Sequence, residues 1–263
     1  PADGWVEHDP NEIWAATLNS VKQVLESSAI AEHGAPTAVG ITDQRETIVL
    51  WDRETLGSAR MAIVWQDRRT AGFCDQLKAD GHEDRVRELT GLRLDPYFSA
   101  TKLSWIKKQE PNVWAGVESG RTAIGTIDSY LIARMTRGVT HVTDASNASR
   151  TLLFDISTGE WSQELCDLFG VPIEALPEVV PSYGQVGTTD PASFAGLELP
   201  IAGIAGDQQA ALFGQACFEV GSSKCTYGTG SFVLVNTGDK IVRSDAGLLS
   251  TVAWKHPDGT LTY

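Results

Sequence analysis

GIAGDQQAALFG, residues 203–214, is an apolar stretch that contains one carboxylate and two amides. The segment at residues 199–205 is short, apolar and led by a proline, as is typical of a buried strand, whereas residues 210–215 have a helix-forming composition. Gly206 and Asp207 therefore fall at a strand-to-helix turn. This stretch predicts one strand–turn–helix unit of an α/β fold.

Two interpretations of Asp207 are open at this point. An aspartate at the start of a helix can be a simple N-cap, whose side chain accepts hydrogen bonds from the free N–H groups of the first turn. Alternatively, open α/β sheets bind ligands beyond the carboxyl ends of their strands, where Asp207, Gln208 and Gln209 would project. A carboxylate in that place can take a proton from a substrate.

Composition and charge limit the classes of partner. The 263 residues are enough for a sizeable core, in one large domain or in one domain plus part of another. The chain has 34 acidic and 21 basic residues and a net charge of −13, which disfavours nucleic acid but leaves a small anionic ligand possible. No apolar run approaches the length of a membrane span, so membrane insertion is not expected.

The cysteines indicate neither a metal site nor a disulfide framework. There are four of them, without C-x-x-C spacing and without a matching histidine cluster: Cys74, Cys166, Cys217 and Cys225. This usage favours a reducing environment, and we therefore expect a cytoplasmic location.

Strand-like and helix-like segments alternate along most of the chain. The strand-like runs lie at residues 38–42, 48–51, 62–65 and 199–205, and the helical ones at 68–89, 99–109, 127–136 and 161–169. This alternation predicts an α/β layer architecture. The character changes at Lys224, after which residues 226–236 and 248–254 are expected to be strands of a second unit that begins as antiparallel sheet.

Both ends of the sequence have the pattern of elements that continue further. Asp9, Pro10 and Glu12 match the N-cap, the first-turn proline and the N3 glutamate of a helix. Residues 257–259 signal a turn, after which a strand begins and stops within residues 260–263. We expect this chain to be part of a longer protein.

Two polar clusters follow predicted strands in the first part of the chain. Arg45 and Glu46 are either an exposed ion pair on a turn or a site for a polyol, because each neighbouring hydroxyl of a polyol can accept from the arginine and donate to the glutamate. Trp65 ends another strand and is either a core residue or an apolar wall for the carbon backbone of such a ligand.

Two further clusters come later. Tyr97 precedes a predicted helix that Ser99 is expected to cap, and its phenol is available to a ligand. Gly228, Thr229 and Gly230 lie directly before a strand. They form either a tight hairpin turn or a phosphate-binding loop, because glycines permit close approach of the backbone and expose N–H groups.

Taken together, these clusters resemble the FGGY carbohydrate kinase family, and within it the members that phosphorylate glycerol. The segment YFSATKLSWIKKQ, residues 97–109, is similar to the first signature of that family. Further similar stretches occur in the same order: GWVEHDPNEIW (4–14), ITDQRET (41–47), VWQDRRT (64–70), HVTDASNASRTLLFD (141–155), GIAGDQQAALFGQ (203–215) and TYGTGSF (226–232). Several long matches in order are more specific than any single motif.

The resemblance implies an actin-like (ribonuclease H-like) ATPase fold. Residues 1–215 would be the substrate-binding domain without its first strands, and residues 216–263 the beginning of the nucleotide-binding domain. The implied reaction is ATP- and Mg²⁺-dependent phosphorylation of glycerol to glycerol 3-phosphate, by an enzyme that is a homo-oligomer at full length. The alternatives are another FGGY sugar or polyol kinase and an inactive binding fragment. The phosphate loop of the family and its adenine pocket are not among these residues, so the chain alone is expected to be inactive.

Roles for individual residues also follow from the resemblance. Asp207 is implied as the catalytic base and as a substrate ligand. The other implied substrate ligands are Arg45, Glu46, Tyr97 and Gln208 through hydrogen bonds, and Trp65 and Phe232 as apolar walls. Thr229, with Gly228 and Gly230, is implied to contact the nucleotide phosphates, and no metal ligand is assigned. Gln209 is expected to be structural, and Asp43 stands where many of the glycerol-phosphorylating members have asparagine.

Overall fold

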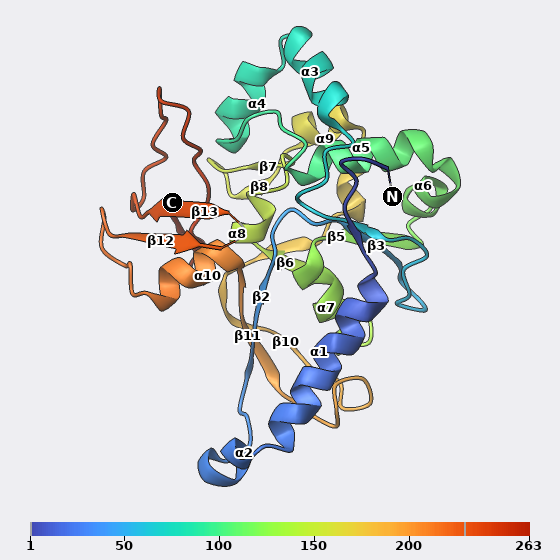
Figure 1. The fold of residues 1–263 in the computed structure, drawn as a ribbon, viewed down its shortest axis with the longest axis vertical. Coiled ribbons are helices and arrows are strands. Elements are labelled where there is room, and N and C mark those ends of the chain that lie inside the picture. Colours follow the sequence, from blue (N-terminus) through green and yellow to red (C-terminus); the bar gives the residue numbers. More distant parts are fainter. Residues whose placement is uncertain (1, 229) are drawn as a thin grey trace.

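The structure is a computed structural model that describes residues 2–228 and 230–263. Figure 1 shows a group of helices at the top, short strands and helices in the middle, and a long helix that runs beside long strands toward the bottom. The N-terminal segment and the C-terminal hairpins lie on opposite sides of this arrangement. No helix in the described ranges is long and apolar enough to cross a membrane.

Three strands form the sheet that carries the site, in the order β10 (Tyr183–Thr188), β11 (Pro200–Gly206) and β2 (Val39–Asp43). β2 and β11 are parallel, and Gly206 is the register partner of Asp43. The two parallel strands therefore end side by side, so that the residues following each of them meet at one edge of the sheet. The strands predicted at residues 38–42 and 199–205 are confirmed, each shifted by one residue.

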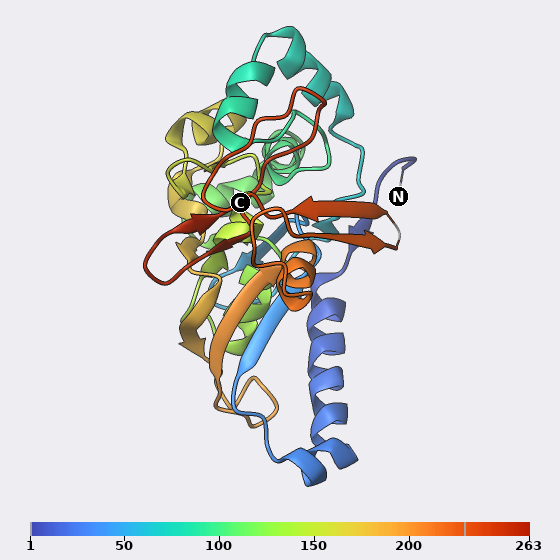
Figure 2. The ribbon, with the colours of Figure 1, turned by 90° about the vertical axis from the view of Figure 1, so that its left-hand side faces the viewer.

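Two helices connect the N-terminus to this sheet, α1 (Pro10–Leu25) and α2 (Ser28–His33). The predicted start of α1 is confirmed: Asp9 is its N-cap and accepts a hydrogen bond from the Asn11 N–H at 2.8 Å, and Pro10 occupies the first turn. Figure 2 shows α1 running alongside β2 and β11. Trp14 of this helix is buried in one apolar core together with Ile201 and Ile204 of β11.

The upper part of the molecule is mainly helical. Its helices are α3 (Ala71–Ala79), α4 (Glu83–Thr90), α5 (Ser99–Gln109), α6 (Pro111–Glu118) and α9 (Gln163–Phe169). They enclose another apolar core that includes Phe98, Leu103 and Ile106. The single helix expected at residues 68–89 is wrong, because Gly81 adopts a left-handed φ of 86° and separates α3 from α4.

The bounds predicted for α5 are confirmed, but the expected capping by Ser99 is wrong. Phe98 occupies the N-cap position, and Ser99 is the first helical residue. The Ser99 hydroxyl donates to the Glu46 carbonyl oxygen at 3.1 Å and thus connects α5 to the residues that follow β2.

The remaining elements of the first 215 residues are short. The strand pairs are β1 (Glu7–His8) with β4 (Ala62–Ile63), β3 (Val49–Asp52) with β5 (Thr122–Gly125), β6 (Val142–Asp144) with β9 (Glu178–Val180), and β7 (Phe154–Asp155) with β8 (Glu160–Trp161). The helices are α7 (Ile127–Met135), α8 (Ala145–Ala148), the 3₁₀ turn η1 (Ile173–Ala175) and α10 (Asp207–Gly214).

Two antiparallel hairpins follow α10: β12 (Ser223–Tyr227) with β13 (Ser231–Val235), and β14 (Trp254–Lys255) with β15 (Leu261–Thr262). The single strand expected at 226–236 is wrong, because the turn of the first hairpin lies within it. The strand expected at 248–254 is also wrong except at its last residue. There the backbone bonds to the first part of the chain instead, as in the hydrogen bond from Ser250 N–H to the Gly91 carbonyl at 3.1 Å.

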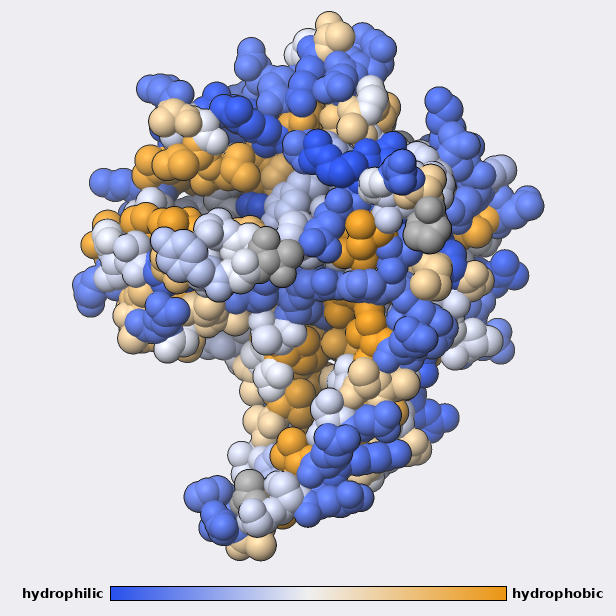
Figure 3. Space-filling view, viewed as in Figure 1, coloured by the Kyte–Doolittle hydropathy of each residue, from blue (hydrophilic) through white to orange (hydrophobic). Residues whose placement is uncertain are grey.

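Apolar side chains gather on the surface of this C-terminal part, on the left in Figure 3. The exposed ones include Val233, Val235, Val242, Leu248 and Leu249. The boundary expected between residues 215 and 216 falls just after the end of α10, at the point where the parallel architecture gives way to hairpins. A boundary there stays a prediction.

Candidate functional site

A cavity of about 250 Å³ lies at the carboxyl ends of β2 and β11. Its lining comes from segments far apart in the sequence and consists of Gln44, Arg45, Glu46, Trp65, Tyr97, Asp207, Gln208, Thr226, Gly228, Gly230 and Phe232. The structure therefore brings together all seven residues expected to bind substrate. Gly228 and Gly230, expected to contact nucleotide phosphates, line the same cavity. Thr229 lies outside the described residues.

The turn after β2 aims two charged side chains inward. Glu46 adopts a φ of 65°, which is uncommon for a residue with a side chain. Arg45 is 5 % exposed and Glu46 is 1 % exposed. The interpretation of this pair as an exposed ion pair is therefore wrong. A charged pair buried in this way needs further partners, because isolated buried charges are very costly.

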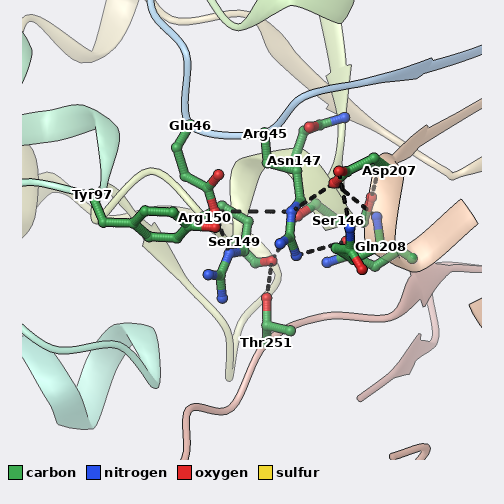
Figure 4. A network of polar contacts seen from close by, with 12 residues as sticks. Arg45, Glu46, Tyr97, Ser146, Asn147, Ser149, Arg150, Asp207, Gln208 and Thr251 are labelled. Atoms are coloured by element: carbon green, nitrogen blue, oxygen red, sulfur yellow. Dashed lines mark hydrogen bonds and ion pairs between the residues drawn. The ribbon is translucent and has the colours of Figure 1, made fainter. Parts of the chain in front are cut away.

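Arg45 finds its partners on α10. Its Nε lies 3.1 Å from Asp207 Oδ1, and its Nη1 donates to Gln209 Oε1 at 3.1 Å. Gln209 is buried, and its Nε2 donates to the Val252 carbonyl at 3.1 Å, which agrees with the structural role expected for it. Figure 4 shows the Arg45 side chain reaching toward Asp207 and Gln208.

Asp207 is the first residue of α10, and Gly206 occupies the N-cap position. The N-cap interpretation of Asp207 is therefore wrong. Its Oδ1 accepts from the adjacent Gln208 N–H at 2.8 Å, while 45 % of the side chain stays exposed. The carboxylate is thus oriented by Arg45 and by the helix start and still faces the open cavity.

Glu46 finds its partner on the segment that follows α8. Its Oε1 accepts a hydrogen bond from Arg150 Nε at 2.8 Å, whereas Arg45 Nε is 3.9 Å away. The Arg150 guanidinium lies 5.8 Å from the centre of the Tyr97 ring and 5.1 Å from that of Phe98. Sequence reasoning missed this residue. The stretch at residues 141–155 resembles the family, but no local pattern links Arg150 to a glutamate 104 residues earlier.

Three aromatic rings form the apolar wall of the cavity. The centres of Trp65 and Tyr97 are 5.5 Å apart and those of Trp65 and Phe232 are 6.5 Å apart, in edge-to-face contacts. Burial raises the pKa of the Tyr97 phenol, so this group stays a neutral hydrogen-bond donor near neutral pH. The backbone of Tyr97 is held by Lys102 Nζ, which donates to its carbonyl at 2.7 Å.

Lys102 itself is fully buried, and its amine also donates to the Phe98 carbonyl at 3.1 Å. Burial lowers the pKa of Lys102 to about 7. Sequence reasoning placed no buried charge in this helix. The lysine is the fourth residue of α5, and its ammonium reaches back to carbonyls before the helix start.

Three buried carboxyl groups lie behind the cavity: Asp43, Asp128 and Asp144. Asn147 Nδ2 joins two of them, donating to Asp43 Oδ1 and to Asp144 Oδ1 at 3.1 Å each. Burial raises the pKa of all three, for Asp128 to about 6, and repulsion from neighbouring carboxyl groups adds to this effect at Asp43 and Asp128.

This acidic cluster is linked to the cavity through Ser146. The Ser146 hydroxyl donates to Asp144 Oδ1 at 2.9 Å and accepts from the Gly206 N–H at 2.9 Å. The residue just before Asp207 is therefore anchored to α8. Figure 4 shows the Ser146 and Asn147 side chains of this helix.

The turn of the first hairpin closes the cavity on the side of the C-terminal part. The Gly228 N–H donates to the Gly230 carbonyl at 3.0 Å, so the tight hairpin turn considered for this stretch is present. In the described residues, this N–H is engaged within the turn. A role of the turn toward phosphate groups stays a prediction.

The cavity has the chemistry of a site for a small polyhydroxy compound. Glu46 and Asp207 offer acceptors, Arg45 and Gln208 offer donors, and the aromatic wall can cover a carbon chain. Each hydroxyl of a polyol both donates and accepts, so alternating donors and acceptors suit several of them at once. A volume of about 250 Å³ suits a compact ligand.

Comparisons with known proteins show which family this chain resembles. The N-terminal domain of the FGGY family of carbohydrate kinases matches residues 1–214. The glycerol kinase of Methylobacterium nodulans is 53 % identical over 255 residues, which are 97 % of this chain and 50 % of that protein. The glycerol kinase of Alcanivorax borkumensis is 54 % identical over 263 residues, which are 100 % of this chain and 52 % of that protein. The chain spans about half the length of the curated relatives it matches.

The crystal structure of Plasmodium falciparum glycerol kinase with ADP has a TM-score of 0.94 at 36 % identity, over 100 % of this chain and 53 % of that one. The structure of a gluconate kinase from Lactobacillus acidophilus has a TM-score of 0.84 at 19 % identity, over 99 % of this chain and 51 % of that one, which speaks to the fold alone. The predicted actin-like ATPase fold is thereby confirmed. The family model matches residues 1–214, and the relatives from Methylobacterium nodulans and Alcanivorax borkumensis share more than half of their aligned residues with this chain along nearly its whole length. This chain therefore belongs to the FGGY family of carbohydrate kinases.

Proposed function

We propose that the full-length gene product phosphorylates a terminal hydroxyl of glycerol with ATP and yields glycerol 3-phosphate. The observation that carries this proposal is the buried Arg45–Glu46 pair next to the partly exposed carboxylate of Asp207, all three lining one cavity of about 250 Å³. Glycerol needs only a few donors and acceptors and a short apolar surface. The 53 % identical relative from Methylobacterium nodulans carries the name glycerol kinase, which supports the same substrate.

Asp207 has the central chemical role in this proposal. The hydroxyl oxygen forms a bond to the γ-phosphorus of ATP, the bond from that phosphorus to the bridging oxygen breaks, and its electron pair leaves with ADP. The hydroxyl proton goes to the Asp207 carboxylate. Arg45 orients this carboxylate from 3.1 Å, so that the base is aligned before the substrate arrives.

The other lining residues hold the substrate. Glu46 accepts from one hydroxyl, and Arg45, Tyr97 and Gln208 donate to the hydroxyl oxygens. Trp65 and Phe232 cover the carbon chain. Gly228 and Gly230, at the turn between β12 and β13, would face the phosphates of ATP.

The proposal includes Mg²⁺, as in phosphoryl transfer generally. Among residues 2–228 and 230–263, however, no group of three or more histidine, cysteine, aspartate or glutamate side chains is arranged to hold a metal ion. No step is therefore assigned to the ion within this chain. From the resemblance to the family, we also propose that the full-length protein is cytoplasmic and forms a homo-oligomer.

A substrate panel tests the proposed function. The full-length gene product is assayed for ADP formation with glycerol, erythritol, xylulose and gluconate, and the product is identified by phosphorus NMR. We expect kcat/KM for glycerol to exceed that for each of the others by at least about tenfold, which corresponds to about 1.4 kcal/mol of differential transition-state binding. A higher value for another compound, or the absence of turnover with glycerol, would refute the assignment.

The same assay applied to residues 1–263 alone tests whether this part suffices. We expect no glycerol-dependent ADP formation, because the phosphate loop and adenine pocket implied by the family resemblance are not among these residues. Turnover above a protein-free control would contradict this expectation.

A further inference from the structure

Lys224 is a buried cation next to the cavity that the proposed mechanism does not use. It lies on β12, is 3 % exposed and is not among the residues that line the cavity. Its Nζ donates to Gln208 Oε1 and, at 2.8 Å, to Thr226 Oγ1. Both of these partners do line the cavity. Lys224 therefore supports the cavity wall from behind.

The contact with Gln208 constrains the orientation of an amide. Gln208 has one donor end and one acceptor end, and its Nε2 donates to Asp207 Oδ2 at 3.0 Å while its Oε1 accepts from Lys224. A lysine ammonium can only donate, and an ionised carboxylate can only accept. Reversing the amide would place its NH₂ against the ammonium and its oxygen against the carboxylate. Both neighbours thus favour the same orientation.

This orientation decides what Gln208 offers to a substrate. The NH₂ group carries two hydrogens, of which one is used by Asp207, so the second is available to an oxygen atom in the cavity. With the opposite orientation, Gln208 would present an acceptor beside the acceptors of Asp207 and Glu46. A hydroxyl oxygen in the cavity would then lose one of its donors.

We propose that Lys224 is a positioning residue that holds the Gln208 amide with its NH₂ toward Asp207 and the cavity, and so makes Gln208 a hydrogen-bond donor to the substrate. This inference rests on the proposed function, because it assigns the specificity of that same site. It also gives the C-terminal part of the chain a second role in substrate binding besides that of Phe232, since Lys224 reaches α10 from the same hairpin. Burial lowers the pKa of Lys224, which agrees with a site shielded from solvent.

A double-mutant cycle on the full-length gene product tests the proposal. The variants are Lys224→Met, Gln208→Leu and the double variant, and the measured quantities are KM and kcat for glycerol and the calorimetric Kd. We expect Lys224→Met to raise KM and Kd by about tenfold, the loss typical of a hydrogen bond to a charged group, with kcat changed less than about threefold. In the Gln208→Leu background the same substitution should change KM by less than about twofold, because Lys224 acts through Gln208.

If Lys224→Met changes KM by the same factor in the wild-type and the Gln208→Leu backgrounds, the proposal is overturned. A lysine that merely stabilises β12 would act independently of Gln208. Lys107→Met serves as a control, since Lys107 also donates to a carbonyl, that of Gly170 at 2.9 Å, but lies outside the cavity lining. We expect it to leave KM unchanged. Melting temperatures of all variants are recorded to identify loss of folding.

A conservative variant covers the case in which Lys224→Met does not fold. Lys224→Arg keeps a donor cation and should keep KM within about threefold of wild type. A tenfold rise in KM with an unchanged melting temperature would refute the positioning role.

The cycle separates this inference from the proposed function. If the wild-type protein does not use glycerol, the cycle is run with the substrate that the panel identifies, because the predicted coupling concerns Gln208 and not the identity of the polyol. If glycerol is the substrate and the effects are additive, only the role of Lys224 fails.

Discussion

Asp207 is the residue on which the proposed chemistry depends. Its carboxylate is 45 % exposed to the cavity, lies 3.1 Å from Arg45 Nε and accepts from the adjacent Gln208 N–H. Asparagine has the same shape and keeps one oxygen acceptor, but it cannot take a proton at neutral pH.

We therefore expect Asp207→Asn in the full-length gene product to lower kcat by at least about 100-fold, the usual contribution of a positioned base, while KM for glycerol changes less than about threefold. Steady-state kinetics with wild-type protein as reference measures both. Retention of more than about a tenth of the wild-type kcat would remove Asp207 from this role.

Arg150 is the partner that makes a buried Glu46 tolerable. Its removal leaves Glu46, which is 1 % exposed, with Arg45 Nε at 3.9 Å as its nearest cation. Breaking a buried ion pair by removing one partner costs about 3–5 kcal/mol. We expect Arg150→Met to lower the melting temperature by several degrees and to raise KM for glycerol at least about tenfold, because Glu46 and Tyr97 both lose their support.

The matched control is Arg68→Met. Arg68 also forms an ion pair, with Asp95 at 3.1 Å, but the two side chains are 57 % and 40 % exposed. An exposed pair contributes only about 0–1 kcal/mol, so this variant should melt within about two degrees of wild type and keep its KM. Similar behaviour of the two variants would show that the Arg150–Glu46 pair is not needed for the site.

The strand–turn–helix unit of β11 and α10 is packed directly against Arg45. A Cβ atom at Gly206 would lie 2.6 Å from Arg45 Cγ and from Cδ, although φ and ψ at this position, −59° and 149°, are accessible to any residue. The glycine is therefore required by space and not by backbone conformation. A side chain here must displace the arginine that orients Asp207.

We expect Gly206→Ala to lower kcat/KM by roughly 100-fold, as for a displacement of about 1 Å in a catalytic group. Gly203→Ala is the control in the same strand, because a Cβ there would meet its nearest atom, the Ser182 carbonyl oxygen, at 3.7 Å. It should keep kcat/KM within about threefold. A Gly206→Ala variant that is as active as Gly203→Ala would show that Arg45 does not need its observed position.

The buried acidic cluster makes the stability of the whole molecule depend on pH, because its carboxyl groups join three separate elements, β2, α7 and β6. Their folded-state pKa values are raised, so the native protein binds protons more tightly than the unfolded chain does. This contribution to stability is fully present below the ordinary carboxyl pKa near 4. It is lost as the pH rises through the raised pKa values of these groups; the pKa of Asp128 is about 6.

Asp43→Asn removes one carboxyl group from this cluster and keeps an oxygen that can accept from Asn147. The measured quantity is the melting temperature of Asp43→Asn minus that of wild type. We expect this difference to increase by at least about 2 °C from pH 5 to pH 8. Asp258→Asn is the control: Asp258 is an exposed turn residue whose pKa is lowered by the Thr260 backbone N–H, so its difference from wild type should stay constant over this range. A constant difference for Asp43→Asn as well would contradict the assignment of raised pKa values to the cluster.

Local patterns in the sequence determined much of the architecture. Capping residues gave the start of α1, the composition of residues 99–109 gave α5 with its observed bounds, and the alternation of elements gave an α/β fold. The residues that line the cavity followed from a family resemblance. These features depend on hydrogen bonds and side-chain periodicity within a few residues, which a sequence displays directly.

Tertiary structure alone decided which charges are buried and with which partners. Arg45 and Glu46 are consistent with a surface turn until β11 and Arg150 are placed beside them, and Arg150 is 104 residues away from Glu46. Lys224 reaches Gln208 only because the hairpin folds back onto α10, and Asp43 joins its cluster through Asn147, 104 residues later in the chain. Burial and partner choice are set by the path of the chain between distant segments, and the free energy of a charged group depends on that environment far more than on its neighbours in sequence.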